Sequence, residues 1–293
     1  MDMNISRDLC QEDAYRQSKP LEIYMFIDPL STCCWGLEPV MKKLMVHYGS
    51  YFRFRHVIGG QFPKIVECTK KKYPDLAKSW ERAGCLSGMS CDGDLWLEDP
   101  ILAPYYLPIA IKAAELQGQT AGFRFLRRLQ EVLFLEKQNV SKKHVLLDIA
   151  SKVNLDVDEF KRDLSNSAAV KAVEFDLKMN AEMEVTETPT LVFFSQHLEE
   201  EGLKISGTYA YEVYVGIIEE MLGYTPLQAE LPEIRTFLHT FPFVSTAEIA
   251  TVYNLTTEEA EKWMKKLKLQ GIVECVPVKH GYFWRYKNST VAT

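Results

Sequence analysis

The sequence predicts a mixed α/β protein in which a β-α-β unit and a later β-β-α unit flank a long helical insert. An apolar run at Leu21–Ile27 has the length and composition of a buried strand. Residues 61–181 contain few strand signals but several amphipathic helical stretches. Strand signals return at 190–194, directly after a Thr-Pro pair. This order of elements is that of a thioredoxin fold with an inserted helical domain.

The first unit consists of strand 21–27, a helix at about 35–47 and a strand at 51–58. Gly49 stands where glycine commonly ends a helix. The strand at 51–58 alternates apolar or aromatic residues with Arg53 and Arg55, as a strand with one solvated face does.

The insert divides into helices, and the second half of the sheet follows it. Helices are expected at 109–117, 123–133, 141–150, 157–164 and about 165–180, whereas 80–99 is rich in glycine and cysteine and is expected to be a loop. Leu203–Ser206 is expected as the next strand and Tyr211–Leu222 as the closing helix.

A separate C-terminal unit follows a proline-containing linker at 223–231. Ser245 and Glu248 form a capping-box pattern before its second helix, and a hairpin follows its third helix. Three helices and a hairpin predict a winged-helix-like unit. The predicted division is a polar tail at 1–20, a thioredoxin domain at 21–224 with its insert at about 61–181, and a winged-helix-like domain at 228–293.

Composition limits the function classes. The 293 residues are 47% hydrophobic and 25% charged, as in an ordinary soluble protein. The net charge of −6 offers no general attraction to nucleic acid or to an anionic membrane. Neither a membrane span nor a signal-peptide core is evident, so the expected location is cytoplasmic. An odd count of seven cysteines argues against a disulfide framework.

The corner between the first strand and its helix reads Ser31-Thr32-Cys33-Cys34. Thioredoxin-type enzymes carry a Cys-x-x-Cys pair there, and the first cysteine attacks as a thiolate that the helix N-terminus stabilises. Ser31 takes the place of this nucleophile, and Cys34 takes the place of the second cysteine. A serine hydroxyl ionises too weakly for thiol–disulfide exchange. The sequence therefore predicts a vestigial redox corner with no catalytic residue.

The second thioredoxin signature is Thr188-Pro189, placed before an apolar strand. In that fold the peptide bond before this proline is cis and faces the corner, and the preceding backbone can pair with an extended partner segment. The predicted vestigial corner comprises Ser31, Cys34 and Pro189. The candidate partner-binding residues are Ser31, Cys34, Trp35, Thr188 and Pro189.

Metal, cofactor and nucleic-acid sites are not expected. Cys68, Cys85 and Cys91 lack the paired spacing of a zinc site, and no histidine stands beside them. The third C-terminal helix begins with carboxylates, including Glu258 and Glu261, where a DNA-reading helix would meet phosphates.

The stretches LEIYMFIDP at 21–29 and CWGLEP at 34–39, with the C-terminal unit, resemble the YjbH/SpxH adaptor proteins, a cytosolic branch of the DsbA-like thioredoxin superfamily. The resemblance covers about residues 21–287. It implies a protein without a catalytic step that binds Spx, a thioredoxin-like transcriptional regulator of disulfide stress, and promotes its degradation by the ClpXP protease. Many members hold zinc in a His- and Cys-rich tail, whereas this tail has Cys10 and no histidine.

An alternative resemblance is to kappa-class glutathione transferases and chromene-carboxylate isomerases. These enzymes have a serine at the position of Ser31, which donates a hydrogen bond to the glutathione thiolate, and a tryptophan at the position of Trp35. Their Gly-x-Asp turn after the last strand is replaced here by Ser-Gly-Thr-Tyr at 206–209, which lacks the acid. They also lack the C-terminal unit, so this enzyme function is the less favoured expectation.

Overall fold

The computed structural model describes residues 19–59, 72–102, 104–195 and 202–287. Residues 1–18 of the predicted tail, with Cys10, and the segment around Cys68 lie outside these residues. A four-stranded sheet has the order β2-β1-β3-β4. Its strands are β1 (Leu21–Ile27), β2 (Phe52–Ile58), β3 (Thr190–Ser195) and β4 (Leu203–Ser206). The β1–β2 pair is parallel, whereas β1–β3 and β3–β4 are antiparallel, which confirms the predicted thioredoxin topology.

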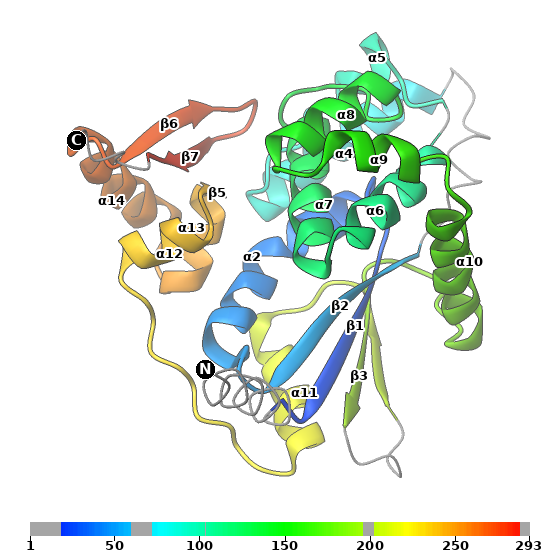
Figure 1. Cartoon of the computed structure of the whole chain (residues 1–293). Coiled ribbons are helices and arrows are strands. Elements are labelled where there is room, and N and C mark those ends of the chain that lie inside the picture. The colour runs from blue at the N-terminus through cyan, green and yellow to red at the C-terminus, as the bar shows by residue number, and fades with distance from the viewer. Residues whose placement is uncertain (1–18, 60–71, 103, 196–201, 288–293) are drawn as a thin grey trace, which may run out of the picture.

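Alternation along β1 divides its side chains between two layers of helices. Leu21, Ile23 and Met25 point into the main core, which they share with α2 (Thr32–Tyr48) and α11 (Tyr211–Leu222). Phe26 points to the opposite face, where a small cluster includes Met179 from helix α10. The sheet is therefore covered on both faces, as Figure 1 shows.

Within the described residues, every secondary-structure element between β2 and β3 is a helix. The insert consists of α4 (Tyr73–Ser87), α5 (Leu95–Glu98), α6 (Tyr106–Leu116), α7 (Gln119–Phe134), α8 (Lys143–Lys152), α9 (Val157–Asp163) and α10 (Ser167–Glu182). The prediction of a loop across 80–99 was wrong at both ends. Gly84 lies inside α4. A Cβ at this position would come within 2.7 Å of the Cys91 backbone nitrogen, so the close contact requires glycine. This glycine permits close packing and does not mark a loop.

The C-terminal unit has its own small core and its own sheet. It consists of α12 (Ile234–Thr240), β5 (Phe243–Ser245), α13 (Thr246–Tyr253), α14 (Thr257–Leu269), β6 (Val273–Pro277) and β7 (Tyr282–Tyr286). Its strands run antiparallel in the order β5-β7-β6. The Ser245–Glu248 capping box is confirmed. The short strand β5 was not predicted, and the likeness to a winged helix and the domain boundaries stay predictions.

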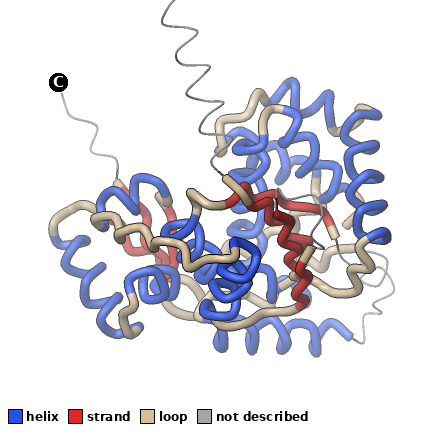
Figure 2. The backbone as a smooth tube through the Cα atoms, turned by 90° about the horizontal axis from the view of Figure 1, so that it is seen from below, coloured by secondary structure: helices blue, strands red, loops and turns tan. Residues whose placement is uncertain are grey.

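Helix α2 lies at the centre of the molecule. One of its faces packs on the main core, and α13 of the C-terminal unit packs against it as well. The linker after α11 runs past the C-terminal end of α2, where the Ala229 amide donates to the His47 carbonyl at 2.9 Å. Figures 1 and 2 show the two sheets apart, with helices around each. Within the described residues, no helix combines the length and apolarity needed to span a bilayer.

Candidate functional site

The thioredoxin corner retains its backbone geometry. Ser31 is the N-cap of α2, and its Oγ accepts a hydrogen bond from the Cys34 amide at 3.3 Å. The Thr188–Pro189 peptide bond is cis, as predicted. Just before the helix, Asp28 Oδ1 accepts from the Leu30 amide at 2.9 Å. Helix α2 begins at residue 32, three residues earlier than expected, because Ser31 caps it.

A pocket of about 430 Å³ opens at this corner. It brings together the strand-to-helix turn, the end of α10 and the loop before the cis-proline; its lining is Asp28, Ser31, Asn180, Val185, Thr186, Glu187 and Thr188. Of the five predicted contact residues, Ser31 and Thr188 line this pocket and are partly exposed. Cys34 and Pro189 are buried.

The Cys34 thiol is not a reactive nucleophile. Burial raises its pKa to about 12, although hydrogen bonds at the Asp28 backbone and the Ser31 side chain act in the opposite direction. At neutral pH almost no thiolate forms, and the thiolate is the species that attacks a disulfide. Cys34 is buried in the main core, where it packs as a small apolar residue. Its neighbour Cys33 is exposed.

Among the residues that line the pocket, Asp28 alone is buried, and its side chain is ionisable. Its side chain is only 9% exposed, and burial raises its pKa to about 6 despite the hydrogen bond from Leu30. The corner therefore contains a carboxyl group that titrates close to neutrality.

Trp35 does not reach the surface, which corrects its assignment as a partner contact. It is fully buried, and its Nε1 donates to the Ser90 carbonyl at 3.1 Å. Its ring stacks on Phe134 of α7 and on Phe283 of β7, with centroid distances of 5.6 and 6.2 Å. The Arg127 guanidinium lies 4.5 Å from the ring centroid. Trp35 thus joins α2, the insert and the C-terminal unit.

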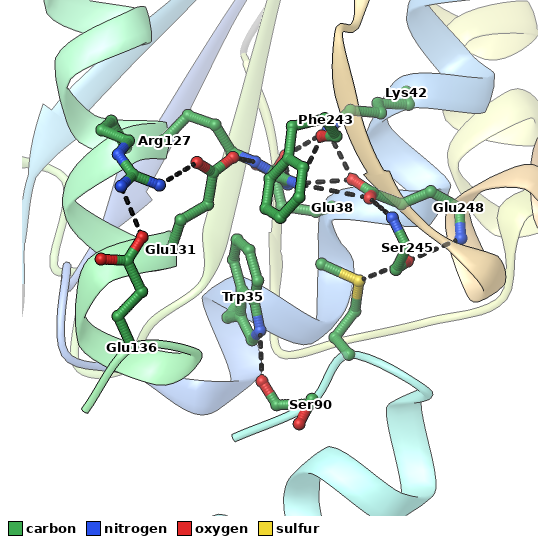
Figure 3. A network of polar contacts seen from close by, with 12 residues as sticks. Trp35, Glu38, Lys42, Ser90, Arg127, Glu131, Glu136, Phe243, Ser245 and Glu248 are labelled. Carbon is green, nitrogen blue, oxygen red and sulfur yellow. Dashed lines mark hydrogen bonds and ion pairs between the residues drawn. The ribbon is translucent and has the colours of Figure 1, made fainter. Parts of the chain in front are cut away.

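A network of charged side chains surrounds Trp35, and we name it the junction (Figure 3). It consists of Glu38 and Lys42 from α2, Arg127 and Glu131 from α7, and Glu248 from α13. Arg127 contacts Glu131 at 2.9 Å, Glu38 at 3.0 Å, and Glu248 at 2.9 and 3.2 Å. Lys42 contacts Glu38 at 2.6 Å and Glu248 at 2.7 Å. Three parts of the chain therefore share one set of ion pairs.

Two carboxylates of the junction, Glu38 and Glu248, stay ionised although burial opposes their charge. Burial alone would raise the pKa of Glu38, but Lys42 and Arg127 outweigh it and lower this pKa to about 2. Burial likewise opposes the charge of Glu248, yet Arg127 and Lys42 lower its pKa below the ordinary value. Glu248 also accepts from the Ser245 amide at 2.6 Å, so one carboxylate serves both the capping box and the junction.

Sequence reasoning did not find the junction. Two signals were available, since Glu38 and Lys42 are four residues apart, as are Arg127 and Glu131. Such pairs occur on many solvated helices. Only packing of α2, α7 and α13 shows that these pairs face one another.

Comparisons with known proteins agree with this architecture. A family model described as Thioredoxin matches residues 24–216. A relative from Halalkalibacterium halodurans named "ClpXP adapter protein SpxH" is 46% identical over 97% of this chain and 96% of its own length. A Bacillus subtilis relative of the same name is 49% identical over 91% of this chain and 89% of its own.

A solved structure of a putative protein disulfide isomerase from Nitrosomonas europaea shares the fold. It superimposes with a TM-score of 0.59 at 16% identity, covering 70% of this chain and 97% of that one. Identity of nearly one half to the named relatives, over nine tenths or more of this chain, completes the assignment begun by the thioredoxin topology and its altered corner: the chain belongs to the SpxH family.

Proposed function

We propose that this chain is a cytoplasmic, non-catalytic adaptor that binds the transcriptional regulator Spx and promotes its degradation by the ClpXP protease. In this role it keeps the disulfide-stress response low. The observation that carries the proposal is the 46% identity over 97% of the chain to a relative named ClpXP adapter protein SpxH.

The corner supports a function without catalysis. An oxidoreductase needs a thiolate there, whereas the first position is Ser31 and burial raises the pKa of the Cys34 thiol to about 12. The Ser31 hydroxyl oxygen already accepts a hydrogen bond from the Cys34 amide, as the N-cap of α2. A glutathione-dependent reaction at Ser31, the alternative from sequence, receives no support from the named relatives.

We place the partner contact at the rim of the corner pocket, at Ser31 and Thr188. Both are partly exposed and line the same pocket, and the exposed Glu187 adds a negative charge beside them. Cys34, Trp35 and Pro189 are buried, so they offer no surface for direct contact.

The test is the rate at which purified ClpXP degrades Spx with and without this chain. We expect a large acceleration with the wild-type chain, and its loss in Ser31→Arg and Thr188→Arg, whose long charged side chains would fill the rim. Ser165→Arg is the matched control, because Ser165 is exposed on the insert.

The outcomes separate the two parts of the proposal. Absence of both acceleration and Spx binding contradicts the adaptor function itself. Acceleration that survives both rim substitutions keeps the adaptor function and rejects the corner as the contact surface.

A further inference from the structure

A second set of charged contacts joins the C-terminal unit to the insert, at the tip of the β6–β7 hairpin. Lys279 Nζ lies 2.7 Å from Glu81, 3.1 Å from Asp92 and 2.8 Å from Asp94. The three carboxylates come from α4 and from the segment between α4 and α5. Their oxygens lie within 4.8 Å of one another, so they form a compact acidic group around one ammonium.

His280 strengthens the same contact from the next position. Its backbone amide donates to Ser90 Oγ at 3.1 Å, and its imidazole contacts the Glu81 carboxylate. Ser90 in turn accepts from Trp35 Nε1 through its carbonyl. The hairpin tip therefore lies directly on the segment that supports Trp35.

The tip differs from the junction in how its charges meet water. Within the junction, the Glu248 side chain is fully buried. At the tip, the Lys279 side chain is 30% exposed and that of Asp94 is 44% exposed, so dissolved salt screens these pairs. Gly281 has a left-handed φ of +89° and closes the turn. From residue 277 to residue 282 no apolar side chain is fully buried, although Val278 packs against the main core. A segment held mainly by exposed charges opens locally at low cost.

From these contrasts we propose that the hairpin tip is a latch, meaning the contact of Lys279 and His280 with Glu81, Ser90, Asp92 and Asp94. The latch opens while the junction stays closed. Opening uncovers Ser90, which is buried and whose Oγ accepts a hydrogen bond from the His280 amide. Opening the latch thus changes the surface beside Trp35 without separating the C-terminal unit from the insert. This inference does not depend on which partner the protein binds.

Hydrogen exchange of the full-length chain, followed by mass spectrometry, tests the latch. We expect the amides of 276–283 and 89–94 to exchange about 10-fold faster or more in Lys279→Glu, because the substitution places a fourth carboxylate at the tip. Amides of α13 and α14 should keep their wild-type rates. Raising the salt concentration from about 0.05 M to about 0.5 M should accelerate the same two segments in the wild-type chain.

Lys178→Glu is the matched control, because Lys178 pairs with Glu182 on α10 at 3.6 Å and lies outside the latch. It should leave both segments unchanged. Asp94→Lys added to Lys279→Glu should restore protection by reversing the pair. If Lys279→Glu does not fold, the salt titration of the wild-type chain decides.

Two results would overturn the proposal. Unchanged exchange at 276–283, in Lys279→Glu and at high salt, would mean that charge does not hold the tip. Faster exchange throughout α13 and α14 would mean that the whole C-terminal unit detaches and that no separate latch exists.

Discussion

Two carboxyl groups near the start of α2, one before the helix and one in its first half, have pKa values shifted in opposite directions. Burial raises the pKa of Asp28, in the corner, to about 6. Glu38, about two helical turns further on, is partly buried, but Lys42 and Arg127 lower its pKa to about 2. Burial penalises both charges, and only the second group has cations beside it to offset the penalty.

The difference shows how one helix serves two purposes. The corner retains the cap, the cis-proline and an open pocket, but its buried groups are left without strong partners. In the junction every charge contacts an opposite charge, and the contacts of Glu38, Lys42, Arg127 and Glu248 join different elements (Figure 3). We infer that the junction holds the three parts of the chain together and that the corner remains available as a surface. The following substitutions test that division.

The largest effect is expected for Arg127→Met. It removes the cation that contacts Glu38, Glu131 and Glu248 and leaves those carboxylates short of a partner inside the protein. We expect the free energy of unfolding to fall by about 3–5 kcal/mol in urea denaturation. Arg124→Met, on the exposed face of the same helix, should cost less than about 0.5 kcal/mol. A decrease in the free energy of unfolding below about 1 kcal/mol in Arg127→Met would show that the junction is not the main contact that stabilises the three parts of the chain against one another.

Trp35→Phe should have the next largest effect. It removes the Nε1 donor to Ser90 and part of a ring packed between Phe134 and Phe283. We expect a loss of about 1.5–3 kcal/mol by thermal or chemical denaturation. The control is Trp263→Phe, at a partly buried tryptophan within the C-terminal core, which should cost less. Equal losses would indicate that Trp35 has no special role between the three parts.

Asp28→Asn should stabilise the protein, and the gain should depend on pH. The folded pKa of about 6 lies above the ordinary 3.8, so folding favours the protonated acid, and this contribution is lost as pH rises through 6. The variant should be more stable by about 1–2 kcal/mol near pH 8 and equal to wild type near pH 4. Asparagine keeps the acceptor for the Leu30 amide.

The companion variant Glu38→Gln should behave in the opposite way. Because the fold lowers the pKa of Glu38 from 4.5 to about 2, its ionised form contributes stability above about pH 4.5, and this stability is lost as pH falls toward 2. Denaturation across this pH range should show the variant weaker than wild type at pH 8. Two variants with the same sign at pH 8 would contradict the contrast between corner and junction.

The smallest effect is expected for Ser31→Ala. The cap bond to the Cys34 amide is long at 3.3 Å, and its loss should cost about 0.5–1 kcal/mol. Acceleration of Spx degradation should remain within about twofold of wild type, because no reaction depends on the hydroxyl. Loss of activity with normal stability would show that the Ser31 hydroxyl itself contacts the partner.

The local patterns predicted much of the fold. The bounds of β4 at Leu203–Ser206 and α11 at Tyr211–Leu222 match those expected, because a period of two or of 3.6 residues and the flanking turns lie within the segment itself. The capping box at Ser245 and the altered corner at Ser31 are also local patterns. The burial of Trp35 was missed, since a tryptophan on a helix does not reveal what covers it.

The sequence by itself determined the thioredoxin topology, the loss of the corner nucleophile and the family, because each depends on residue types in a short order along the chain. Tertiary structure alone decided that Arg127 meets Glu248 across 121 residues and that Lys279 meets Glu81 across 198. The reason is physical. An ion pair between distant residues forms only once the fold has brought both side chains together and offset the entropy of ordering them, and no local pattern records which partner the fold will supply.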